Sequence, residues 1–136
     1  IQWCNDIIYN MKAATRQDIS RAAHLLRVVI AHEMDDLEFF DSTLRSSQRF
    51  FNKFKSEPSY ALANGIMNKI RQLSNAPVGD YKSILKDLKT YIVENRTAQE
   101  SKALLGLDEL ILLWIESKLQ QRSTASMLRD KNARAV

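Results

Sequence analysis

The sequence has very few residues that interrupt regular structure. Its 136 residues include three glycines and two prolines. A β protein with many strands needs turns at short intervals, and turns depend on these residues. The scarcity therefore favours long helices joined by short connections.

Cysteines and long apolar runs are also scarce. Cys4 is the only cysteine, so no internal disulfide can form, and a reducing, cytoplasmic compartment is expected. The longest apolar run is "LILLWI", six residues at 110–115. A membrane span needs about eighteen, so the sequence predicts no contact with membranes.

The start of the chain lacks the marks of a secretory signal. It reads "IQWCNDIIYNMK", without an initiator methionine or a basic leader before an apolar core. Because it reads like the middle of a helix, we expect the chain to be a piece of a longer protein.

Size and composition are those of one globular domain. Apolar residues make up 45% and charged residues 26% of the chain, which is the usual range for globular proteins. A length of 136 residues fits one domain. The net charge of +4 permits an acidic partner without requiring one.

Apolar residues recur at intervals of three to four along the chain, which predicts helices throughout. The expected helices lie at 1–14, 18–34, 36–54, about 59–74, 80–93 and 98–121. Short connections make neighbouring helices antiparallel. We predict an all-α fold of about six antiparallel helices in stacked hairpins, either a tetratricopeptide-like α-solenoid or a compact bundle. We expect residues 1–121 to form a single helical-repeat domain, and 122–136 to be a polar, basic tail or frayed helix.

The expected helix at 18–34 has apolar residues on two faces. Leu25 and Val28 point away from the predicted core line, so the helix needs covering on two sides. That core line consists of Ile19, Ala22, Ala23, Leu26, Val29, Ile30 and Met34.

The expected helix at 36–54 separates aromatic from basic residues. Leu37, Phe39, Phe40, Leu44, Phe50, Phe51 and Phe54 share an arc of about 160° at 3.6 residues per turn. We expect Phe40, Leu44 and Phe51 to be buried. Arg45, Arg49 and Lys53 fall on the other side, as a solvated face or a contact surface for an acidic partner. A platform for single-stranded nucleic acid needs aromatics and cations in one groove, so nucleic-acid binding is a weaker alternative.

Two stretches carry a resemblance to a known family. "AHLLRVVIAHEMDDLEFFDSTLRSSQRFFNKF" with the following "YALANGIMNKIRQL", and "DELILLWIESKL" near the end, resemble the C-terminal part of large tetratricopeptide-repeat-like proteins of Bacteroidetes. The resemblance covers roughly residues 15–121 and implies a helical-repeat fold with a scaffold role and no active site. The usual Trp–Leu–Gly–Tyr first helix and closing proline are missing, which implies degenerate repeats or a terminal cap.

Two short patterns raise the question of catalysis. "HEMDD" at 32–36 is one residue away from the zinc-protease pattern H-E-x-x-H, but Asp36 replaces the second histidine. Here Asp35 or Asp36 is expected to cap the next helix instead. Arg27 and His32 fit R-x4-H, which resembles the ribonuclease signature of HEPN domains. No glycine-rich phosphate loop or E-x-x-H pair is present, so neither a cofactor nor a metal is predicted.

These observations favour a non-enzymatic helical-repeat domain that acts as a scaffold through protein contacts. The expected partner is another protein or neighbouring repeats of the same chain. Arg45, Arg49 and Lys53 are the candidate interaction surface. Self-association through Trp3, Ile7 and Met11 remains an alternative, as does an RNA-directed ribonuclease or nucleic-acid-binding domain.

Overall fold

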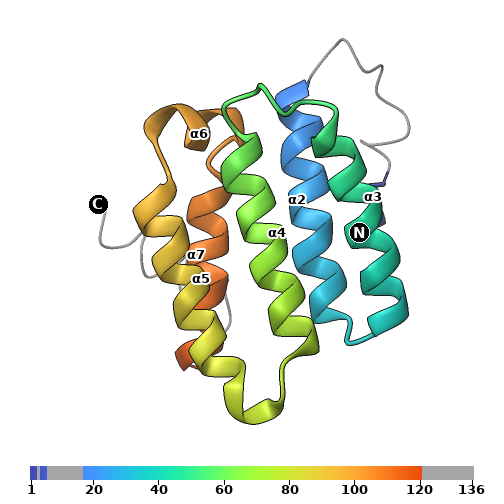
Figure 1. Cartoon of the computed structure of the whole chain (residues 1–136), viewed down its shortest axis with the longest axis vertical. Helices are drawn as coiled ribbons and strands as arrows, with labels where there is room; N and C mark the ends of the chain where they lie inside the picture. Colours follow the sequence, from blue (N-terminus) through green and yellow to red (C-terminus); the bar gives the residue numbers. More distant parts are fainter. Residues whose placement is uncertain (3, 6–16, 121–136) are drawn as a thin grey trace.

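The computed structural model describes residues 1, 2, 4, 5 and 17–120. This part of the chain is built from helices and their connections, without a strand, as predicted (Figure 1). The predicted N-terminal helix and the C-terminal tail lie largely outside the described residues. The elements are α2 (Gln17–Glu33), α3 (Leu37–Asn52), α4 (Tyr60–Asn75), the short 3₁₀ turn η1 (Val78–Asp80), α5 (Tyr81–Asn95), α6 (Ala98–Ala103) and α7 (Leu107–Gln120).

The long helices run antiparallel to their neighbours in sequence (Figure 1). α2 packs on α3, α4 packs on α5, and α5 packs on α7, while α4 also contacts α2 and α3. The fold therefore has two ends. We call the end where α2, α4 and α7 finish and α3 and α5 begin the pocket end, and the end that carries α6 the corner end.

α2 is covered on two sides, as its two apolar faces predict. Leu25 and Val28 are fully buried, because α3 and α4 both pack against this helix. The predicted core line of α2 is partly wrong: Ala23 and Val29 are buried, but Leu26 is half-buried and Met34 lies beyond the helix, exposed. Periodicity shows that two apolar stripes exist but does not show which one the neighbouring helices cover.

α3 buries the side that its sequence pattern selects. Phe40, Leu44 and Phe51 are each at most 2% exposed, as predicted. Leu37 shares the apolar arc of these residues but is exposed, because it occupies the first position of the helix at the end of the fold. The three cations of the opposite face, Arg45, Arg49 and Lys53, are exposed.

The predicted single helix at 98–121 is wrong, because the chain turns sharply after α6. Leu105 and Gly106 both have positive φ, 56° and 73°. The Gly106 N–H donates to Ser101 O at 2.8 Å, and the Leu105 N–H donates to Lys102 O at 3.1 Å. This pair of bonds is the Schellman ending of a helix. A leucine in the left-handed conformation hides the break within a continuous apolar run.

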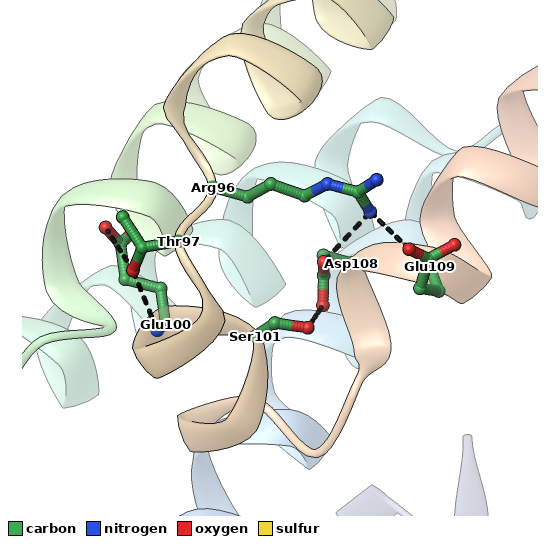
Figure 2. A network of polar contacts seen from close by, with 6 residues as sticks. All are labelled: Arg96, Thr97, Glu100, Ser101, Asp108 and Glu109. Carbon is green, nitrogen blue, oxygen red and sulfur yellow. Dashed lines mark hydrogen bonds and ion pairs between the residues drawn. The ribbon is translucent and has the colours of Figure 1, made fainter.

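A charged network fixes this corner (Figure 2). Asp108, fully buried, accepts from Arg96 at 3.3 Å and from the Ser101 hydroxyl at 2.8 Å. Arg96 also forms an ion pair with Glu109. The Thr97 side chain caps the start of α6. The end of α5 and the middle of α6 are thus both tied to the start of α7 by paired polar groups.

Candidate functional site

A pocket of about 500 Å³ opens at the pocket end. Five helices and η1 contribute to its walls, so no single segment of sequence defines it. Ala31, Phe40 and Leu73 give it an apolar interior. Three polar side chains, His32, Ser74 and Tyr81, come from α2, α4 and α5.

The tight turn between α2 and α3 shapes one side of the pocket. Asp35 adopts a left-handed backbone with φ 54°, which aspartate tolerates better than most residues. Asp36 then caps α3, and its side chain accepts from Phe39 N–H at 3.1 Å. This confirms the cap expected from sequence. Leu37 follows directly and is thereby held at the rim.

Exposed apolar side chains lie at the opening. Leu37 is 54% exposed and Val78, in η1, is 95% exposed; both line the pocket. Met34 is exposed as well, next in sequence to the pocket residue Asp35. Scattered exposed leucines are common on proteins. Several around one cavity are the usual mark of a binding surface.

His32 of α2 forms hydrogen bonds with side chains of α4 and α5. Its Nδ1 lies 2.7 Å from Ser74 Oγ, and its Nε2 lies 2.8 Å from the Tyr81 hydroxyl. The imidazole also stacks on the Tyr81 ring at 5.9 Å and meets Trp114 edge-on at 5.8 Å. Both ring nitrogens are therefore occupied, and the ring is held in one orientation.

Burial keeps this group of side chains neutral. It lowers the pKa of His32 below its ordinary value, although the nearby Glu33 carboxylate opposes the shift. Burial also raises the pKa of Tyr81 to about 12. In a neutral imidazole one nitrogen donates and the other accepts. Ser74, His32 and Tyr81 are thus joined by hydrogen bonds between neutral groups.

A serine hydrogen-bonded to a histidine also occurs in catalytic triads, where the serine is the nucleophile and the histidine the base. In a triad the base takes the serine proton, and a carboxylate on its other nitrogen stabilises the resulting imidazolium. Here that nitrogen contacts the neutral phenol of Tyr81. The lowered pKa of His32 further disfavours the imidazolium. The arrangement suits a rigid, polar pocket floor better than acyl transfer.

Glu33 joins α2 to α7 beside the pocket. Its Oε1 accepts from the Trp114 indole at 2.6 Å and forms an ion pair with Lys118 at 2.8 Å. Lys118 also lines the pocket. The wall that carries Lys118 is therefore neutralised by Glu33.

Arg27 and His32, the pair considered as an alternative ribonuclease site, have different side-chain partners. Arg27 is 6% exposed and donates to Asn5 Oδ1 at 3.3 Å, whereas His32 contacts Ser74 and Tyr81. Within the described residues, no group of three side chains is placed to hold a metal ion. The basic residues of α3 lie on its exposed face and do not line the pocket.

Sequence reasoning missed Ser74, Tyr81 and Val78. Ser74 and Val78 lie in the stretch "SNAPVGD" at 74–80, which reads simply as a loop, and Tyr81 reads as a core residue of the next helix. Only their meeting with His32, more than forty residues away in sequence, gives them a role. The exposed Val78, an apolar residue inside a turn, was the one visible signal.

Comparisons with protein-family models, with curated proteins and with solved structures find no match to this chain. The resemblance to tetratricopeptide-repeat-like proteins therefore stays a prediction. Among the helices of the described part, none has the length and apolar character to cross a bilayer.

Proposed function

We propose that this chain is a non-enzymatic protein-interaction domain, part of a larger scaffold protein, and that it binds its partner at the pocket end. The observation that carries this proposal is the pair of exposed apolar residues, Leu37 and Val78, on the rim of a pocket of about 500 Å³. Binding there would remove both side chains from water, which is the main source of affinity in protein contacts.

The walls of the pocket support binding rather than catalysis. Its polar floor is held neutral by burial and mutual hydrogen bonds. Preorganised polar groups in an apolar pocket orient a bound side chain and select among partners.

Two other hollows are weaker candidates. The groove between α5 and α7, beside Val93, is crossed by the ion pair between Lys89 and Glu116. The hollow between α2 and the corner end, beside Leu105, has about 260 Å³, roughly half the volume of the pocket. Both provide controls, because Val93 and Leu105 are exposed apolar residues, as Leu37 and Val78 are.

The test uses a library of short random peptides displayed on phage and selected on the immobilised domain. We expect selected peptides, made synthetically, to bind the wild type and to lose affinity about tenfold or more for the double variant Leu37→Gln/Val78→Gln. The control is Val93→Gln/Leu105→Gln, which should bind like the wild type. All four positions are exposed, so both variants should fold.

Two outcomes would contradict the proposal. One is a library that yields no peptide bound by the wild type. The other is a set of peptides whose binding is lost in the Val93→Gln/Leu105→Gln variant and retained in Leu37→Gln/Val78→Gln.

A further inference from the structure

Charge is strongly segregated along the chain. Between Val28 and Leu44 there is no lysine or arginine, although the whole chain has a net charge of +4. This stretch forms the end of α2, the turn between α2 and α3, and the first half of α3, on one side of the pocket. It contains five carboxylates: Glu33, Asp35, Asp36, Glu38 and Asp41.

Four of these carboxylates are available to a partner. We call Asp35, Asp36, Glu38 and Asp41 the acidic edge; all four are exposed. Glu33 is bound to Lys118, but within the described residues no lysine or arginine forms an ion pair with the acidic edge. Asp36 uses one oxygen to cap α3.

The acidic edge adjoins the apolar rim. Asp35 and Asp36 line the pocket together with Leu37, and Glu38 and Asp41 follow on the first turns of α3. Of the two lysines that line the pocket, Lys118 is neutralised by Glu33, which leaves Lys82. The unpaired charge around the opening is therefore predominantly negative.

We infer that the partner is a basic peptide segment of another protein, which inserts one apolar side chain between Leu37 and Val78 and places lysine or arginine residues against the acidic edge. This inference rests on the proposed function and specifies the chemistry of its ligand. Burial of the apolar side chain supplies affinity, while the opposite charges orient the segment and speed its association.

The same charges exclude two other kinds of ligand from this surface. An acidic or phosphorylated segment would face four unpaired carboxylates, and like charges brought together at an interface cost several kcal/mol. Nucleic acid is repelled for the same reason, since its binding depends on neutralising phosphates.

The first test is the sequence of the peptides selected on the wild-type domain. We expect lysine or arginine within a few positions of an apolar residue. A synthetic peptide of this kind should associate about tenfold more slowly when salt is raised from low to high concentration, because screening shortens the reach of the charges. Selected peptides without basic residues would overturn the inference.

The second test removes the charge of the acidic edge and keeps its shape. In the triple variant Asp35→Asn/Glu38→Gln/Asp41→Asn, Asp36 is left as the cap of α3. We expect the affinity for the basic peptide to fall about tenfold and most of its salt dependence to disappear.

The matched control changes net charge by the same amount elsewhere. Glu57, Asp87 and Glu94 are exposed carboxylates on other segments. The variant Glu57→Gln/Asp87→Asn/Glu94→Gln should bind the peptide like the wild type. An equal loss in both triple variants would mean that overall charge, not the acidic edge, attracts the peptide, and would overturn the inference.

Failure of the inference and failure of the proposed function give different results. If peptide binding needs Leu37 and Val78 but is indifferent to the acidic edge and to salt, the inference is wrong and the proposed function stands. If binding is indifferent to Leu37 and Val78, both are wrong.

The chain's own C-terminal segment is the remaining occupant to test, since it is also basic. A synthetic peptide of residues 121–136 should compete poorly with the selected peptide. Competition at equal concentration would assign the pocket to this chain itself, in the same or a second copy, and would overturn the assignment to a partner protein.

Discussion

The two ends of the molecule treat their charged residues in opposite ways. At the corner end, buried Asp108 is satisfied by Arg96 and Ser101, and Glu109 completes the pairing (Figure 2). At the pocket end, four carboxylates stand exposed without an ion pair among the described residues, beside exposed apolar side chains. Paired, buried charge holds helices together; unpaired, exposed charge contributes little to stability and is free to meet a partner.

The comparison predicts where substitutions change stability and where they change binding. The largest loss of stability is expected in the hydrophobic core, which supports both ends. Phe51 of α3 is 1% exposed. The change Phe51→Ala should lower the free energy of unfolding by about 3–5 kcal/mol. Chemical denaturation measures this directly. A loss below about 1 kcal/mol would show that α3 is not buried along this face.

The two histidines of α2 differ in their surroundings. His24 is 5% exposed and stacked on Phe50 at 4.0 Å, while His32 lines the open pocket. Burial, aided by the positive charges of Arg27 and Lys53, lowers the pKa of His24 from 6.5 to about 4. The folded protein therefore favours the neutral imidazole, and the unfolded chain binds the proton more readily.

Stability should consequently fall as the pH drops from about 6.5 to about 4. The contribution of His24 is fully present above pH 6.5 and amounts to roughly 3 kcal/mol, at about 1.4 kcal/mol per pKa unit. Urea denaturation of wild type and His24→Gln at several pH values isolates this contribution, because carboxylates titrate in both. Parallel pH profiles for the two proteins would contradict it.

The sequence was most informative for α3 and the turn before it, where one short segment carried the whole signal. The strong separation of apolar and basic residues on α3 predicted the burial of Phe40 and Phe51. The short acidic turn before α3 predicted a cap at Asp35 or Asp36, and the structure places it at Asp36. The break between α6 and α7 was missed because Leu105 adopts a conformation that normally indicates glycine or asparagine. The pocket was missed because His32, Ser74 and Tyr81 belong to three helices, and their meeting is a property of packing.

A matched pair of carboxylates tests the comparison most directly. Asp108→Asn removes the charge from the buried network, so the bonds from Arg96 and Ser101 weaken, and we expect a loss of about 1–3 kcal/mol. Asp35→Asn makes the same change at the pocket end. Asparagine tolerates the left-handed backbone there, so stability should stay within about 0.5 kcal/mol. Equal losses in urea denaturation would mean that the two ends do not differ as described.

The basic side of α3, which belongs to neither end, should also contribute little to stability. Arg45, Arg49 and Lys53 are exposed, and side chains of this kind contribute little to folding. Changing all three to glutamine should leave the free energy of unfolding within about 1 kcal/mol of wild type.

The aromatic residues of the same helix are turned inward: Phe51 is buried, and Phe50 stacks on His24. Cations and aromatic rings therefore do not share a groove in which single-stranded nucleic acid could stack. We expect no binding of a single-stranded oligonucleotide at low salt, where electrostatic binding is strongest. Salt-sensitive binding that disappears in the triple glutamine variant would instead assign this face to nucleic acid and place a second functional surface beside the pocket end.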